Sequence, residues 1–210
     1  MKKGIQVIAI HGGDAYDTYE QYIESLLKEK IDYKDFFKKG WKKTLAEKLD
    51  DRFEVITPRF PNEANAKYKE WKIRFEKIIP FINDGVVLIG HSLGGMFLAR
   101  YLAENKFPKK IKATMIVASP HTEKLDHSLA DFIIPKNLVP FEEQGGEIFL
   151  YYSNDDPLMK EPMEHLKSYQ RCLPNIHVRT FSDHGHFSGE EFPEIISDIK
   201  NLVWSFETRQ

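Results

Sequence analysis

The chain has 210 residues, and its 30 basic and 32 acidic side chains give a formal net charge of −2. This length suffices for one sizeable hydrophobic core, and the balance of charge gives no general attraction to nucleic acid or to an anionic membrane surface. The single cysteine, Cys172, excludes an internal disulfide framework, and no stretch approaches the ~18 apolar residues of a membrane-spanning helix. We therefore expect a cytoplasmic protein with one domain over residues 1–210.

Strand and helix patterns alternate along the first half of the chain. The apolar run 5–10 predicts a buried strand that ends at His11-Gly12-Gly13. The other elements predicted in this half are helices over 18–30, 33–49 and 64–81 and a strand over 53–57. Lysines surround the apolar stripe of 33–49, as in a helix that lies on a membrane surface. A solvated helix that packs one stripe on a sheet is the commoner arrangement, and we expect it here.

The second half continues the alternation. Its predicted strands cover 86–89, 112–118, 147–152 and 176–181, and its last predicted helices cover 161–171 and 193–206. Strands that alternate with helices predict an α/β fold, a three-layer sandwich around a mainly parallel six-stranded sheet. If the second strand lies outside the first, the strand order is 2-1-3-4-5-6, and ligands bind at the carboxyl ends of the strands. We expect residues 121–146 to form a small cover over that site.

The residues after the third strand carry the most informative motif. Gly90, Ser92 and Gly94 form the pattern Gly-x-Ser-x-Gly, with an apolar strand before it and helix-forming residues after it. In a nucleophile elbow the serine occupies a sharp strand-to-helix turn, and the glycines prevent collisions with the neighbouring strand and helix. The helix start also directs unpaired N–H groups at the serine oxygen. Ser92 is therefore the predicted nucleophile.

A serine hydroxyl needs a general base, and on this fold the order along the chain is serine, acid, histidine. Two histidines, His184 and His186, follow the sixth predicted strand. Gly185 directly precedes His186 and would let that part of the loop approach the serine closely. We therefore predict His186 as the base and expect a supporting or exposed position for His184.

Two adjacent carboxylates, Asp155 and Asp156, follow the fifth predicted strand. Neighbouring side chains point in different directions, so only one of them can face the histidine. We choose Asp156, because Pro157 would fix the turn behind it. Asp155 is expected to hydrogen-bond the backbone of its own loop.

The remaining requirement is an oxyanion hole, a pair of N–H donors for the negative oxygen of the reaction intermediate. The residue after the nucleophile, Leu93, supplies one amide on this fold. The second comes from the loop after the first strand, where we choose the amide of Gly13. The glycines of that loop also have a purely conformational interpretation, in which they only let the backbone turn.

A metal site is the main chemical alternative at these loops. His184 and His186 could chelate an ion together with His11 and an aspartate. Their spacing matches no zinc signature, and a metal site would leave Ser92 unexplained. We expect neither a metal nor another cofactor.

Together these motifs resemble the α/β-hydrolase superfamily, and within it the small serine hydrolases typified by retinoblastoma-binding protein 9. The resemblance rests on Ile89-Gly90-His91-Ser92-Leu93-Gly94, on Ser153-Asn154-Asp155-Asp156-Pro157 and on Gly185-His186-Phe187. It implies the same triad of Ser92, Asp156 and His186. The resemblance supplies no substrate. From the residues of the triad themselves we predict a serine esterase that acts on a small-molecule acyl substrate.

Three functions remain open at this point. The first is hydrolysis of an ester, thioester or amide of a small to medium acyl group through an acyl-serine intermediate. The second is a protein-binding module that keeps the hydrolase fold. The third is acyl transfer to an acceptor other than water by the same triad. The intact set of catalytic residue types favours hydrolysis, without nucleic acid as a partner.

Overall fold

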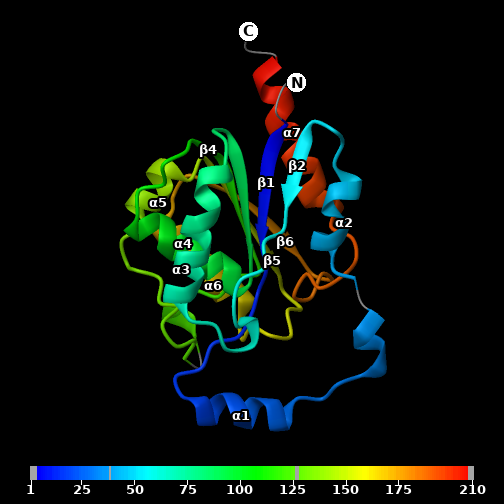
Figure 1. Ribbon diagram of the computed structural model, residues 1–210, viewed down its shortest axis with the longest axis vertical. Coiled ribbons are helices and arrows are strands. Elements are labelled where there is room, and N and C mark those ends of the chain that lie inside the picture. The colour runs from blue at the N-terminus through cyan, green and yellow to red at the C-terminus, as the bar shows by residue number, and fades with distance from the viewer. Residues whose placement is uncertain (1–3, 38, 126–127, 208–210) are drawn as a thin grey trace.

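The computed structural model describes residues 4–37, 39–125 and 128–207. Its centre is one six-stranded sheet in the order β2-β1-β3-β4-β5-β6, and all neighbouring strands are parallel (Figure 1). The strands are β1 (Ile5–Ile10), β2 (Phe53–Ile56), β3 (Val86–His91), β4 (Ile111–Val117), β5 (Glu147–Ser153) and β6 (Ile176–Phe181). The predicted strand order and the parallel direction are confirmed.

Helices cover both faces of this sheet, as the prediction of three layers requires (Figure 1). One face carries α3 (Tyr68–Ile78), α4 (Leu93–Glu104), α5 (Val139–Gln144) and α6 (Pro162–Cys172). The other carries α2 (Trp41–Lys48) and α7 (Pro193–Glu207). Short 3-10 turns occur at η1 (Tyr33–Phe37), η2 (Glu63–Asn65), η3 (Ile79–Phe81) and η4 (Thr122–Lys124). Among the described residues, no helix has both the length and the apolar character needed to cross a membrane.

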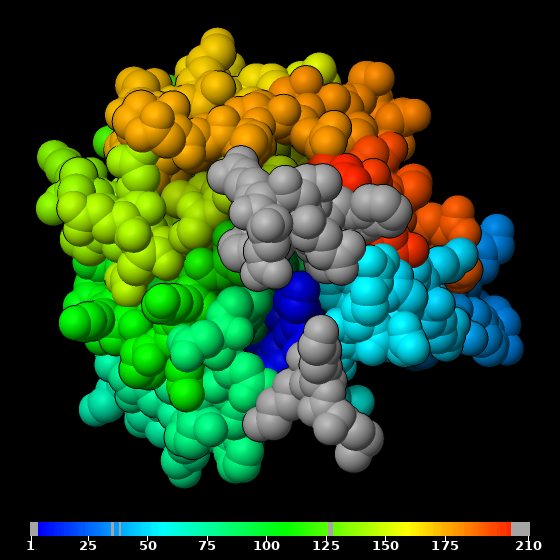
Figure 2. Space-filling model, turned by 90° about the horizontal axis from the view of Figure 1, so that it is seen from above, coloured from blue at the N-terminus to red at the C-terminus, as the bar shows by residue number. Residues whose placement is uncertain are grey.

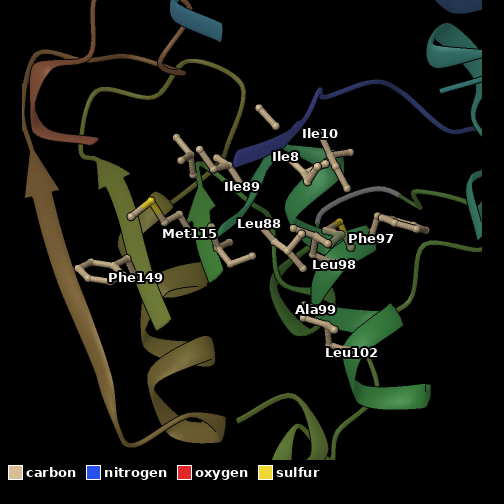
Figure 3. Packing of buried hydrophobic residues seen from close by; sticks show 14 of the residues in the cluster. Ile8, Ile10, Leu88, Ile89, Phe97, Leu98, Ala99, Leu102, Met115 and Phe149 are labelled. Carbon is tan, nitrogen blue, oxygen red and sulfur yellow. The ribbon is translucent and has the colours of Figure 1, made fainter. Parts of the chain in front are cut away.

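The central strands are apolar on both sides because helices cover both faces of the sheet. Side chains alternate along β3, so Leu88 points toward Leu98 of α4 while Ile89 points to the other face (Figure 3). The register places Ile89 beside Met115, and Met115 beside Phe149, on that second face. The continuous apolar runs of the sequence are thereby explained.

The prediction of a single helix over 33–49 is wrong. The 3-10 turn η1 ends at Phe37 and α2 begins only at Trp41, after an extended Gly40 with φ −78° and ψ 152°. Glycine inside a helix costs about 1 kcal/mol relative to alanine, so this position favours a break. The Trp41 amide donates to the Gly189 carbonyl at 2.9 Å and its Nε1 donates to the Phe187 carbonyl at 2.9 Å. Tertiary contacts therefore set where α2 begins.

The apolar stripe predicted for 33–49 is also divided. Trp41, Leu45 and Leu49 are buried against the body of the protein. Tyr33 and Phe37, earlier on the same stripe, are exposed. Only the second part of the stripe packs as predicted.

Residues 16–37 form a segment that we call the arm. It passes below the carboxyl ends of the strands and carries α1 (Tyr19–Lys28) and η1 (Figure 1). Its first residues are tied to the body, because Lys67 Nζ donates to the Tyr16 carbonyl at 2.6 Å and Ser128 Oγ donates to Asp17 Oδ1 at 2.9 Å. No residue of α1 is buried, although its apolar residues have helical spacing. At the opposite end of the molecule, the start of β1 lies in the middle of the face and α7 extends beyond the sheet (Figure 1 and Figure 2).

Candidate active site

Ser92 lies between β3 and α4 in a backbone conformation that few non-glycine residues adopt, with φ 55° and ψ −123°. Its amide donates to the Val117 carbonyl at 2.8 Å, which ties the turn to β4. A Cβ on Gly90 would lie 2.5 Å from the Gly94 carbonyl oxygen, and one on Gly94 would lie 2.5 Å from the His11 carbonyl oxygen. The two glycines are therefore needed for close packing around a strained serine.

The segment after β1 lies directly against this turn. A Cβ on Gly12 would lie 2.9 Å from Ser92 Cβ. Gly13 follows and lines the same cavity as Ser92 and Leu93. Leu93 is the first residue of α4, so its amide has no helical carbonyl one turn earlier to bond. The two residues chosen as oxyanion donors thus border one cavity with the serine.

His186 and Asp156 are brought together from the loops after β6 and β5. His186 Nδ1 lies 2.8 Å from Asp156 Oδ2, and the Asp156 side chain is fully buried. The other carboxylate oxygen, Oδ1, accepts the Leu158 amide at 2.9 Å. When Nδ1 carries the proton donated to this carboxylate, Nε2 carries the lone pair that a general base needs. His186 and Ser92 line the same cavity.

Asp155 joins the two loops instead of facing the imidazole. Its Oδ1 accepts the Gly185 amide at 2.9 Å and a hydrogen bond from Ser153 Oγ. Ser153 Oγ in turn accepts the His184 amide at 3.1 Å. The hydrogen bond from Ser153 is the main cause that holds the pKa of Asp155 below its usual range. These contacts match the expectation that Asp155 serves the loop backbone.

The other loop histidines face different partners. The ring of His184 hydrogen-bonds Asp183 at 2.8 Å and lies 4.1 Å from the ring of Phe181, centroid to centroid. His11 Nε2 accepts the Phe60 amide at 3.0 Å and so ties the end of β1 to the segment after β2. Within residues 4–37, 39–125 and 128–207, no three histidine, cysteine or carboxylate side chains are grouped in a way that would hold a metal ion.

Two residues near the imidazole were not singled out from the sequence for any part in the site. His91 Nε2 donates to the His186 carbonyl at 2.8 Å, and Lys42 Nζ donates to His91 Nδ1 at 2.9 Å. Burial, together with the neighbouring Lys42 and His186, holds the pKa of His91 well below its usual value. A neutral ring that accepts at Nδ1 carries its proton on Nε2, which is the tautomer that supports the His186 backbone. Lys42 is 49 residues from His91 in the chain, so no local motif signals this contact.

The cavity at Ser92 has a volume of about 280 Å³. Most of its wall is apolar, and its polar side chains are those of Asp14, Ser92, Lys160, His165 and His186. Its lining residues are Gly13, Asp14, Ser92, Leu93, Pro120, Leu125, Leu129, Leu158, Met159, Lys160, His165 and His186. An apolar cavity with a few convergent polar groups is typical of a small-molecule site.

Comparisons with known proteins find similar sequences and similar folds. The sequence profile of the family described as "Serine hydrolase" matches residues 33–191, a range that contains Ser92, Asp156 and His186. "Serine hydrolase RBBP9" of Rattus norvegicus is 22% identical over 170 residues, which cover 78% of this chain and 85% of the rat protein.

Solved structures share the fold at low sequence identity. The ydeN gene product of Bacillus subtilis superposes with a TM-score of 0.67 and 16% identity, over 95% of this chain and 98% of that chain. A structure from a study of carboxylesterases of Nitrososphaera gargenis superposes with a TM-score of 0.57 and 17% identity, over 99% of this chain and 92% of that chain. These neighbours identify the α/β-hydrolase fold.

Proposed function

The chain belongs to the serine hydrolase family, and on this premise we propose that it hydrolyses an ester, thioester or amide of a small to medium acyl group through an acyl-serine intermediate. The observation that carries the proposal is the hydrogen bond between His186 Nδ1 and the buried Asp156, with His186 and Ser92 in the wall of one cavity. That arrangement supplies a nucleophile, a base and an orienting carboxylate.

In the first half of the reaction, Ser92 Oγ attacks the substrate carbonyl carbon as its proton passes to His186 Nε2. The Oγ–C bond forms, and the bond from carbon to the leaving atom breaks. His186 gives the proton to that leaving atom. Asp156 keeps the imidazole in the required tautomer and stabilises its charged form, while the amides of Leu93 and Gly13 donate to the oxyanion. Water then repeats the sequence, and the free acid leaves.

The size and polarity of the cavity support an acyl group of modest length. Its volume of about 280 Å³ lies at the small end of the roughly 300–1,000 Å³ that ligand pockets usually have. Leu125 and Leu129 of the proposed cover over 121–146 contribute apolar wall. The single cysteine supports the cytoplasm as the compartment of this activity.

A chain-length series of 4-nitrophenyl esters, run beside aminoacyl amides, tests this function. We expect kcat/KM to be highest for short or medium acyl chains and to fall for long ones. A fluorophosphonate probe should label the wild type and not Ser92→Ala, and Ser92→Ala should lose activity by about 10³- to 10⁶-fold. A well-folded wild type that neither labels nor hydrolyses any of these substrates would contradict the proposal.

A further inference from the structure

A second cavity, of about 730 Å³, lies between the start of α2, the end of β1 and the segment that follows β2. We call it the basic cavity. Its lining residues are Ala9, His11, Lys42, Lys43, Thr57, Pro58, Arg59, Phe60, Asn62, Glu63 and Ala64. The segment 11–14 borders both cavities, since His11 lines this one while Gly13 and Asp14 line the cavity at Ser92. The two cavities are therefore neighbours across the proposed oxyanion loop.

The charges of the basic cavity are unbalanced. Lys42, Lys43 and Arg59 contribute three positive groups, and Glu63 contributes the one carboxylate in the wall. Glu63 lies 3.6 Å from His11 Nδ1 and not against any of the three cations. Within the part of the chain that the structure describes, neither Lys43 nor Arg59 has an ion pair. A cleft with this excess of positive charge attracts anions.

Lys42 is the least hydrated of these cations. Its ammonium contacts the neutral ring of His91 at 2.9 Å and lies 5.0 Å from the centre of the Trp41 ring. Burial lowers the pKa of Lys42 to about 8. A partly buried ammonium has lost hydration, and an anionic partner restores the lost stabilisation. The partner that the chain itself provides for the Lys42 ammonium is the neutral imidazole of His91. A bound anion would supply the negative charge that this contact lacks.

This cation is also connected to the reaction centre. Lys42 Nζ contacts His91, His91 Nε2 donates to the His186 carbonyl, and the rings of His91 and His186 lie 5.0 Å apart, centroid to centroid. An anion held by Lys42 would therefore bind close to the catalytic imidazole. The anion would lie on the other side of the 11–14 segment from the cavity at Ser92.

From these observations we infer that the basic cavity is an anion subsite, which binds a carboxylate or phosphate group through Lys42, Lys43 and Arg59. The inference rests on the proposed function in one respect. If the cavity at Ser92 binds the acyl group, the anionic group belongs to the leaving group of the substrate. The substrate class is then an ester, thioester or amide whose alcohol, thiol or amine part is anionic. A free small anion has the same chemistry, and the experiment separates the two sources.

The first arm uses two esters with the same acyl group, 4-nitrophenyl butyrate and 3-carboxy-4-nitrophenyl butyrate. Each kcat/KM is divided by the ester's own hydroxide-catalysed rate constant, and ionic strength is kept constant with sodium chloride because salt screens charge. We expect wild type to prefer the carboxylated ester by about tenfold or more, from one or two charge-assisted hydrogen bonds. Arg59→Gln should lower this preference, whereas Arg74→Gln, which removes an exposed arginine of α3 outside the cavity, should keep it.

The second arm measures binding of inorganic phosphate by calorimetry to Ser92→Ala and to the double variant Ser92→Ala/Arg59→Gln. The subsite is supported if phosphate binds to Ser92→Ala and binds more weakly to Ser92→Ala/Arg59→Gln. If wild type also prefers the carboxylated ester, the anionic group that the subsite binds belongs to the substrate. Phosphate binding without that preference supports the subsite for a free anion. Absence of both effects in a protein with native circular dichroism overturns the inference. If phosphate binds but neither ester is hydrolysed, the subsite stands and the proposed function fails.

Discussion

Helices α4 and α1 differ both in sequence pattern and in environment, since α4 is apolar along most of its length and α1 has apolar residues only at helical spacing. In α4, behind Ser92, nine of the twelve residues are buried. In α1, on the arm, none of the ten is buried, and Leu27 is 81% exposed. A local signal marks the start of α1, which has a complete capping box between Thr18 and Gln21, whereas Ser92 makes no side-chain capping hydrogen bond at the start of α4. Periodicity therefore identifies a helix, but it does not reveal whether a partner surface covers the apolar face.

The same contrast extends to the residues around each helix. Near Ser92, side chains are fixed by neighbours from several strands and loops. Along the arm, local contacts dominate, as in the hydrogen bond from the Lys34 amide to Asp32. Identical substitutions in the two regions should therefore have very different effects, and four pairs of variants test this difference.

The largest difference is expected for aspartate. Asp156→Asn should lower kcat/KM by about 10⁴-fold, because an amide in this position no longer favours the tautomer with the lone pair on Nε2 of His186. Asp32→Asn on the arm changes the same atoms at an exposed site and should leave kcat/KM within about twofold of wild type. Steady-state hydrolysis of a 4-nitrophenyl ester measures both variants. Equal losses in the two variants would mean that the buried carboxylate has no special role.

Leucine gives the next largest difference, now in stability. Leu98 of α4 is completely buried, so Leu98→Ala should lower the free energy of unfolding by about 2–5 kcal/mol through lost burial and the cavity left behind. Leu27→Ala on α1 should change it by no more than about 0.5 kcal/mol. Urea denaturation followed by circular dichroism measures both values. A large loss for Leu27→Ala would indicate that the arm is covered in solution.

Glycine gives a smaller difference of the same kind. A Cβ on Gly94 would lie 2.5 Å from the His11 carbonyl oxygen and 2.8 Å from that of Ile10, so Gly94→Ala forces the backbone apart and should cost about 1–3 kcal/mol. Gly40, the residue before α2, has no atom within 4 Å of the corresponding position, and Gly40→Ala should change the free energy of unfolding by no more than about 1 kcal/mol, because the loss of a favourable N-cap is opposed by the lower entropy of the unfolded chain. Thermal unfolding of both variants provides the measurement, and similar midpoints would refute the packing argument.

The last difference is a dependence of stability on pH. The pKa of Lys42 is lowered from 10.5 to about 8 in the folded protein by burial. Between these pH values the unfolded chain binds more protons at this side chain, so its contribution to the free energy of unfolding rises as pH increases. The difference between wild type and Lys42→Met should therefore grow in favour of wild type from about pH 8 to 10.5.

Lys34→Met, an exposed substitution on the arm, is the control for this titration. Denaturation in urea at several pH values measures all three proteins. A difference between wild type and Lys42→Met that stays constant across this range would show that Lys42 keeps its ordinary hydration.

Much of the fold followed from local patterns. The six apolar runs predicted the six strands, because strands covered on both faces leave continuous apolar sequence. Their order depended on the further assumption that the second strand lies outside the first, and the structure confirms it. The motif around Ser92 carried its own structural context, a strand before it and a helix after it. The predicted helix over 33–49 failed because the chain has to turn at Gly40 so that Trp41 can reach the loop that follows His186. That contact joins distant parts of the chain, and no short pattern contains it.

The sequence by itself determined the six strands and the residue types of the proposed triad, since apolar runs and the Gly-x-Ser-x-Gly motif are local properties. The choice between neighbouring residues was decided in space, where Asp156 bonds the imidazole and Asp155 bonds the loop backbone. The cluster of Lys42, His91 and His186 and the uncovered face of the arm emerged only from the tertiary structure. The physical reason is that burial and the pairing of charges depend on which segments, distant in the chain, come into contact. A single sequence does not specify these long-range contacts.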